Sequence, residues 1–195
     1  MNIRLVSAAA ALALLAGCGA ATPPEQPPLM GAKIGGPFAL TDENGRAATD
    51  RDLRGKWRVM YFGYTFCPDI CPTDAQNIGA GLKKFEADDP ERAARVTPVF
   101  VTIDPARDTP AALKAFTDAF HPRMQGLTGS EDAIARVAKA HAVYYRKGEA
   151  APGGGYLMDH QRVTYLMDPQ GRPVALLPSD KSADAVAAEL ARWVT

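Results

Sequence analysis

Cysteine is scarce in this sequence, with three cysteines among 195 residues. Sites that need four cysteines, whether for structural zinc or for an iron–sulfur cluster, are therefore excluded. Cys67 and Cys71 are separated by only three residues, so a disulfide between them would close almost no loop. The sequence is not a disulfide scaffold, and this pair needs a chemical explanation.

An excess of charge of one sign is also lacking. Lys and Arg total 22, Asp and Glu total 22, and the formal net charge is +0 at pH 7. No basic footprint for nucleic acid is present, so we expect no nucleic-acid partner. Hydrophobic residues make up 47% of the chain, which is enough to form a core. A length of 195 residues suits one domain and leaves little room for two.

The sequence contains no apolar run of the roughly 20 residues that a membrane-spanning helix requires. Its apolar stretch over residues 5–16 follows Arg4 and is typical of an export signal. The stretch ends in Leu15-Ala-Gly-Cys18, which is similar to the lipobox of bacterial lipoproteins. A lipid on Cys18 would tether the protein to a membrane without a span.

This N-terminus predicts the domain organisation. We expect a lipoprotein signal peptide over residues 1–17, a lipid-anchored flexible spacer over 18–35 and one domain over 36–195. The protein would be exported and held at the membrane on the periplasmic side. The alternative is an ordinary cleavage site beside an incidental Cys18.

The order of predicted elements favours an α/β fold with a central mixed sheet flanked by helices. The Asn44-Gly45 dipeptide predicts an N-terminal hairpin, and Asp168-Pro-Gln-Gly171 predicts a second one near the C-terminus. This is the element order of thioredoxin-like folds. We expect strands over 57–64, 96–103, 143–146, 163–167 and 173–177, helices over 73–86, 111–120, 130–141 and 183–194, a Gly-rich loop over 147–155, and helix caps at Thr109, Ser130, Ser179 and Asp180.

Cys67 and Cys71 lie where the strand over 57–64 passes into the helix over 73–86. A spacing of four residues puts both sulfurs near the same point at a helix entrance. Unpaired N–H groups there favour the thiolate, which binds soft metals and attacks disulfides. The sequence therefore predicts a reactive or metal-binding dithiol.

His160 is the expected third ligand, because it follows the flexible Gly153-Gly-Gly155 segment that could bring it to the dithiol. His121, at a helix end, and His141, on an amphipathic helix, are expected to be structural. Four acidic residues near the motifs are weaker candidates. Asp69 is expected to lie near the ligands or to cap the helix, Asp159 to point away from His160, and Asp104 and Asp108 to serve in turns and caps.

Two thiolates and one imidazole suit trigonal copper(I), which we favour, or zinc with one open position. A redox dithiol is the main rival, although redox motifs usually have the spacing Cys-x-x-Cys and here it is Cys-x-x-x-Cys. A peroxidase that uses one cysteine is a weaker alternative, because its mechanism has no role for a second cysteine. A purely structural adaptor would not need either cysteine.

Three separated motifs resemble those of the SCO/SenC family of copper-binding assembly proteins. They are Gly63-Tyr-Thr-Phe-Cys67-Pro-Asp-Ile-Cys71-Pro72, Asp104-Pro-Ala-Arg-Asp108-Thr-Pro110 and Tyr156-Leu-Met-Asp-His160. The resemblance covers the chain from about residue 36 onward. It implies a thioredoxin-like fold and a copper site formed by Cys67, Cys71 and His160.

The resemblance also implies a function, that of a metallochaperone for the binuclear copper centre of cytochrome c oxidase. The implied partners are subunit II or another copper acceptor, together with other copper chaperones. The alternative is an extracytoplasmic thiol-disulfide oxidoreductase that acts on client cysteines. In the first case the protein is not a conventional enzyme.

Overall fold

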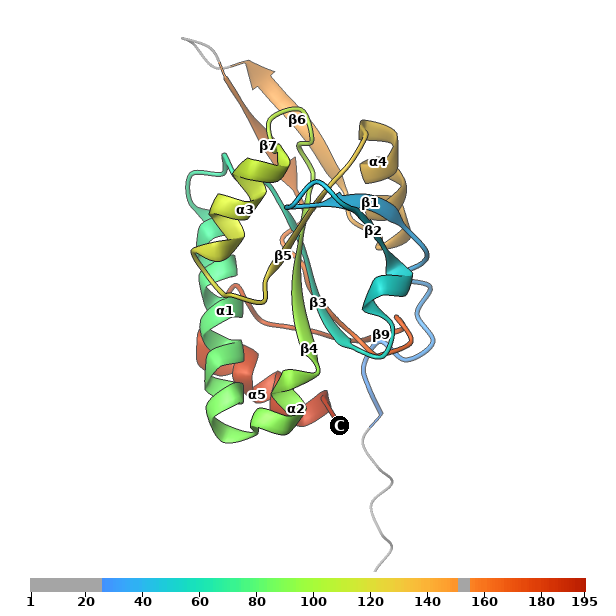
Figure 1. Ribbon diagram of the computed structural model, residues 1–195, viewed down its shortest axis with the longest axis vertical. Helices are drawn as coiled ribbons and strands as arrows, with labels where there is room; N and C mark the ends of the chain where they lie inside the picture. Colours follow the sequence, from blue (N-terminus) through green and yellow to red (C-terminus); the bar gives the residue numbers. More distant parts are fainter. Residues whose placement is uncertain (1–25, 151–154) are drawn as a thin grey trace, which may run out of the picture.

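The computed structural model describes residues 26–150 and 155–195. Its elements form a seven-stranded mixed sheet, in the order β2-β1-β5-β4-β3-β8-β9, with helices on both faces and a separate two-stranded sheet of β6 and β7 (Figure 1). The predicted thioredoxin-like α/β class is confirmed. The elements are β1 Ala39–Asp42, β2 Ala47–Thr49, a 3-10 turn Asp50–Leu53, β3 Trp57–Gly63, α1 Ile70–Asp88, α2 Pro90–Ala94, β4 Val96–Thr102, α3 Pro110–Asp118, β5 Gln125–Thr128, α4 Glu131–Ala140, β6 Tyr145–Ala150, β7 Tyr156–His160, β8 Thr164–Met167, β9 Pro173–Leu176 and α5 Ala183–Trp193.

The two central strands, β3 and β4, carry the core. All seven residues of each are buried, and the strands run parallel with Tyr61 opposite Phe100. Strands that are covered on both faces need apolar residues at successive positions, and the sequence supplies them. Because the strands are parallel, both release the chain at the same edge of the sheet, where Gly63 and Thr102 end them. The segment with both cysteines starts from this edge.

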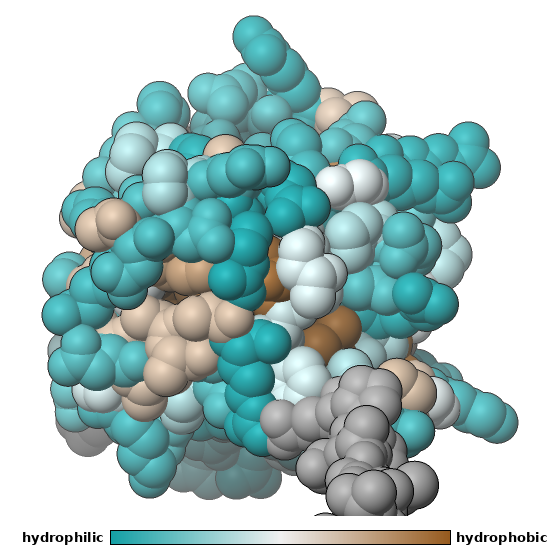
Figure 2. Space-filling view, turned by 90° about the horizontal axis from the view of Figure 1, so that it is seen from below, coloured by the Kyte–Doolittle hydropathy of each residue, from teal (hydrophilic) through white to brown (hydrophobic). Residues whose placement is uncertain are grey.

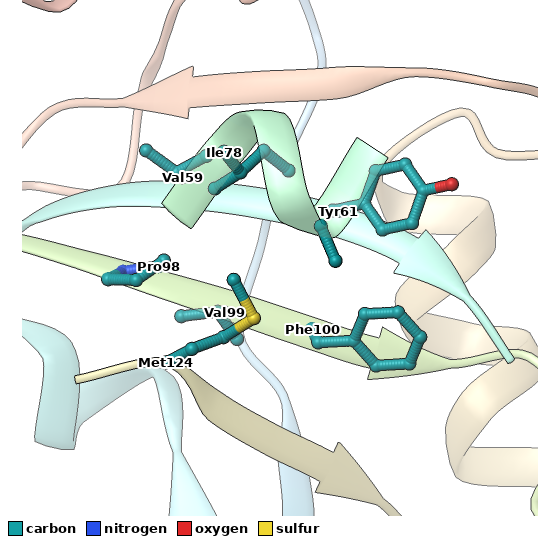
Figure 3. A pocket seen from close by; sticks show the side chains of 8 residues that line it. Val59, Tyr61, Ile78, Pro98, Val99, Phe100 and Met124 are labelled. Carbon is teal, nitrogen blue, oxygen red and sulfur yellow. The ribbon is translucent and has the colours of Figure 1, made fainter. Parts of the chain in front are cut away.

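Helix α1 covers one face of the sheet. Its inward residues Ala75, Ile78, Leu82 and Phe85 are buried and recur at helical spacing. Figure 3 shows the layer that α1 forms with β3 and β4, in which Tyr61 lies at one end with its hydroxyl pointing away from the apolar side chains. The Tyr61 ring also lies near Cys71, because both would meet a Cβ atom added at Gly63.

Several predicted elements are confirmed in detail. Both hairpins form, with Gly45 and Gly171 at positive φ angles of 77° and 80°. Thr109 and Ser130 cap α3 and α4 through their side-chain oxygens, as expected. The helix predicted over 73–86 begins earlier, at Ile70, and therefore includes Cys71.

Other expectations are wrong. Ser182, rather than Ser179 or Asp180, caps α5. The loop expected over 147–155 begins later, because residues up to Ala150 pair with β7 as strand β6. Part of that loop, residues 151–154, lies outside the described residues, as do residues 1–25 with Cys18.

The described chain begins and ends at one end of the molecule, and β6 and β7 project from the other (Figure 1). Figure 2 looks at the first of these ends, where a few strongly hydrophobic side chains show among mostly hydrophilic ones. Residues assigned to the spacer reach the sheet there, since the Leu29 N–H donates to the Val174 carbonyl at 3.0 Å. Over residues 26–150 and 155–195, no helix combines the length and the apolar character that crossing a bilayer takes.

Candidate metal site

Gly63 makes room for the site at the end of β3. A Cβ atom at this position would lie 2.8 Å from the Tyr61 ring, closer than real Cβ contacts, and 3.0 Å from the Cys71 Sγ, tighter than most of them. The chain then turns through Thr65 and reaches Cys67, which is partly buried, before α1 begins. Cys71 is fully buried in the first turn of α1, and both thiols are free. Glycine at position 63 therefore lets the Cys71 sulfur approach the strand.

His160 is the last residue of β7, and its Nε2 lies 3.5 Å from the Cys71 Sγ. Its Nδ1 lies 3.0 Å from the Gln161 carbonyl oxygen. A carbonyl can only accept, so Nδ1 carries the proton and Nε2 presents a lone pair to the sulfur. Burial lowers the pKa of His160, which keeps the ring neutral. This is the form of histidine that binds metals.

The two thiols differ in acidity. Burial raises the pKa of Cys67, but hydrogen bonds from the N–H groups of Cys71, Asp69 and Ile70 outweigh it, so the pKa lies below its usual value. The Cys71 N–H lies 3.4 Å from the Cys67 Sγ. Burial raises the pKa of Cys71 well above its usual value, and a charge on Cys67 raises it further. Cys67 is therefore the readily ionised thiol, and Cys71 gives up its proton only to a strong partner such as a metal.

These residues fit a soft metal ion. A sulfur and a nitrogen that bind one ion, at about 2.3 and 2.0 Å, lie roughly 3.5 to 3.8 Å apart, which is the separation of Cys71 and His160. Among the described residues, no three Cys, His, Asp or Glu side chains already surround a common point. Rotating the partly exposed Cys67 side chain between rotamers moves its sulfur by about 3 Å. Cys71 and His160 thus already have the separation of two ligands of one ion, and a change of rotamer is a route by which the Cys67 sulfur could join this pair.

Comparison with known proteins identifies the family. The family model described as SCO1/SenC matches residues 26–195. The chain belongs to the SCO1/SenC family. A mitochondrial SCO1 homologue of Arabidopsis thaliana is 39% identical over 162 residues, which are 83% of this chain and 47% of that protein. SenC of Rhodobacter capsulatus is 45% identical over 142 residues, 71% of this chain and 61% of that protein.

A solved structure of a SCO1 relative is similar over most of this chain. The crystal structure of Arabidopsis thaliana ScoI, described as having copper bound, superposes with a TM-score of 0.76 at 38% identity. The match covers 82% of this chain and 97% of the solved chain. The chain spans about half the length of the first curated relatives that it matches.

Two acidic residues in this SCO1/SenC chain do more than form turns and caps, which corrects the sequence interpretation. Asp108 is fully buried and accepts hydrogen bonds from the Thr65 N–H at 3.0 Å, the Thr65 hydroxyl at 2.7 Å and the Thr102 hydroxyl at 2.6 Å. Asp104 accepts from the Arg107 Nε at 2.5 Å and from the Tyr156 hydroxyl at 2.8 Å. Asp108 ties the cysteine segment to β4, and Asp104 ties the start of β7 to the same edge.

The side chains of the other candidates do not join the sulfurs, although the backbone N–H of Asp69 is hydrogen-bonded to Cys67. Asp69 occupies the N-cap position of α1 without a side-chain cap hydrogen bond. Asp159 pairs with Arg146 on β6, at 2.9 Å, instead of contacting His160. His141 is buried at the end of α4, where its Nδ1 lies 2.8 Å from the Val137 carbonyl oxygen. His121 is buried 3.4 Å from a carboxylate oxygen of Glu86, which lies near the C-terminal end of α1.

Sequence reasoning missed one charged pair beside the site. Asp74, one turn after Cys71 on α1, is fully buried, and Arg162 follows His160 by two residues. The Arg162 Nε lies 2.8 Å from Asp74 Oδ2, and its Nη2 lies 2.5 Å from Oδ1. The only signal in the sequence is one acid and one base at short distances from two expected ligands, which is too common a pattern to be specific.

Proposed function

We propose that this chain binds one copper ion through Cys67, Cys71 and His160 and delivers it to the binuclear copper centre of cytochrome c oxidase. The observation that carries this proposal is the neutral imidazole of His160, whose Nε2 faces the Cys71 sulfur at 3.5 Å. Copper bound in the Arabidopsis relative, at 38% identity, supports the choice of metal. The acceptor is subunit II or another protein with a copper site.

The donor set favours copper(I) over zinc. Thiolates and imidazole are soft or borderline ligands, and three of them complete a trigonal site, whereas a closed structural zinc site needs four. Cys71 must lose its proton on binding, because burial raises its pKa. Loading is therefore coupled to proton release and strengthens as the pH rises. The metal here is cargo, so the site has to release it as well as bind it.

We further propose that the chain is an exported lipoprotein, tethered through Cys18 on the periplasmic side of a membrane. The described chain begins at the end opposite β6 and β7, and α1 begins near β7 (Figure 1). A tether at that first end would leave the cysteines directed away from the bilayer. The site could then reach an acceptor that protrudes from the same membrane.

Copper titration of the full-length chain in detergent tests the proposal. Reduced, anaerobic protein is expected to bind one copper(I) per chain, in competition with a chromophoric chelator. His160→Ala should weaken the affinity at least about tenfold, because one of three ligands is gone. His121→Gln is the matched control and should bind as the wild type does, since His121 contacts Glu86 instead of the sulfurs. Equal affinity of the wild type and His160→Ala would remove His160 from the site.

The asymmetry of the thiols supports a second function, thiol-disulfide exchange. An accessible cysteine of lowered pKa beside a buried one of raised pKa is the arrangement of an attacking and a resolving thiol. In Cys71→Ser, Cys67 would then form a stable mixed disulfide with an oxidised client, and the wild type would release the reduced client. The client to use is the oxidised soluble domain of the copper acceptor. Tight copper binding with no mixed disulfide would leave the carrier function alone.

A further inference from the structure

The ion pair of Asp74 and Arg162 connects the two segments that carry the closely spaced ligands of the proposed metal site. Asp74 lies three residues after Cys71, on the same face of α1, and both side chains are completely buried. Arg162 lies two residues after His160, in the link between β7 and β8. The ion pair thus lies beside the contact of Cys71 with His160, because it joins the next turn of α1 to the link that follows His160.

The contact has a defined geometry. Arg162 approaches both carboxylate oxygens of Asp74, through Nε at 2.8 Å and 3.1 Å and through Nη2 at 2.5 Å. A two-point contact of this kind fixes the orientation as well as the distance. A buried carboxylate is costly to leave unpaired, so the arginine is held in this position. The link after β7 is thereby held against α1, one turn after Cys71.

Other hydrogen bonds near His160 run in a different direction. The Gln161 N–H donates to the Tyr144 carbonyl at 3.0 Å, and the Gln161 side chain accepts from the Tyr144 N–H at 2.8 Å. These bonds attach the histidine segment to the chain before β6. The pair of Arg146 and Asp159 likewise joins β6 to β7. They hold β6 and β7, which together form a projecting arm (Figure 1), to each other. Arg162, in contrast, holds the end of this arm to α1, the helix that carries Cys71.

We propose that the Asp74–Arg162 ion pair is a clamp that positions His160 against Cys71 for copper binding. This inference rests on the proposed function, because it concerns the same site. The clamp touches no metal, so both members are positioning residues. Without it, the end of β7 could move away from α1. Bringing His160 back to Cys71 would then reduce the net free energy of copper binding.

Copper affinity is measured on the full-length protein in a cycle of variants. Arg162→Met alone would strand a buried carboxylate, so the main variant is Asp74→Leu with Arg162→Met, in which leucine keeps the branched shape of aspartate. Arg162→Lys keeps the charge but loses the two-point contact. Arg146→Met is the matched control, since it removes an Arg–Asp pair from the arm without touching α1. Thermal melting of the copper-free protein follows the stability of each variant.

The double variant should fold and bind copper(I) about 10- to 100-fold more weakly, the range seen when groups behind a metal ligand are removed. Arg162→Lys should give a smaller loss in the same direction, and Arg146→Met should stay within about twofold of the wild type. Visible spectra of the cobalt(II)-loaded double variant should show the change in ligand field that accompanies a weakened nitrogen ligand.

The same changes in a His160→Ala background separate a clamp from general damage. There the double variant should cause no further loss of affinity, because no imidazole remains to be positioned. Wild-type affinity in a folded double variant would overturn the inference while leaving the proposed function intact. A loss of the same size with and without His160 would also overturn it. Unchanged affinity in His160→Ala itself would instead overturn the proposed site.

Discussion

At the scale of residues, the site combines two thiols in opposite environments with one oriented imidazole. Cys67 is partly exposed and surrounded by N–H groups, while Cys71 is buried against β3. His160 is held in one tautomer by the Gln161 carbonyl. The reactive side of the dithiol is therefore Cys67, and Cys71 with His160 is the pair of the proposed metal site that already has the separation of two ligands.

Alkylation of the two thiols in copper-free protein checks this asymmetry. In Cys71→Ser, Cys67 should react with iodoacetamide readily at neutral pH, because hydrogen bonds at the helix entrance lower its pKa. In Cys67→Ser, Cys71 should react at least about tenfold more slowly at the same pH, since burial both raises its pKa and hides it. Rates are followed by mass spectrometry. Equal rates for the two variants would contradict the assignment.

Some of these residues could be predicted from the sequence, and others could not. The spacing of Cys67 and Cys71 predicts two sulfurs near one helix entrance, and the structure places them there. His160 lies 89 residues after Cys71 along the chain, and periodicity alone does not predict that their side chains meet. The Gly153-Gly-Gly155 segment before His160 and the family resemblance together led to this prediction. The Asp74–Arg162 pair escaped both, because a tertiary ion pair has no spacing rule.

At the scale of elements, the segment between β3 and α1 is held by hydrogen bonds to a neighbouring strand. Asp108 receives three donors, two from Thr65 in that segment and one from Thr102 on β4. The Arg107 guanidinium lies over the rings of Phe66 and Tyr156, at 4.9 and 3.7 Å from their centroids. The loop that delivers Cys67 is thus attached to both β4 and β7.

Removing the Asp108 carboxylate should loosen this attachment. Asp108→Ala leaves the Thr65 N–H and the Thr102 hydroxyl without their acceptor, at a cost of about 2 kcal/mol in the free energy of unfolding. Urea unfolding measures the loss. Asp118→Ala is the control, since Asp118 forms an exposed pair with Lys114 on α3 that solvent screens and that should contribute little to stability. Similar losses for both variants would mean that Asp108 does not hold the segment.

The elements that the sequence predicts well are those with strong local patterns. Strands β3 and β4 are continuous apolar runs, and α3 and α4 start with good caps. Strand β5 was missed because its four residues contain a glycine and no alternation, and its place between β1 and β4 is set by tertiary pairing. Strand β6 has a polar sequence, and its pairing with β7 defines it.

At the scale of the whole molecule, all three histidines are in environments that disfavour their charged form. Burial lowers the pKa of His121, His141 and His160 below the usual 6.5. In the unfolded chain they take up protons more readily than in the folded one. Below pH 6.5, unfolding therefore binds protons, and stability falls as the pH falls toward the folded values.

His141 allows this linkage to be measured away from the metal site. Urea unfolding of copper-free wild type should show stability decreasing below pH 6.5. His141→Gln should reduce that slope by up to about 1.4 kcal/mol per pH unit, the contribution of one proton. The comparison uses slopes, so a uniform loss of stability in the variant does not affect it. Parallel curves for the two proteins would show that His141 is not held in its neutral form.

The central claim, that two sulfurs and one imidazole share one copper ion, is tested most directly by X-ray absorption spectroscopy of the protein loaded with copper(I). The wild type is predicted to show a first shell of two sulfur atoms and one nitrogen atom, with the nitrogen lost in His160→Ala and one sulfur lost in Cys67→Ser. A shell of sulfur alone in the wild type, or one unchanged by His160→Ala, would contradict the account.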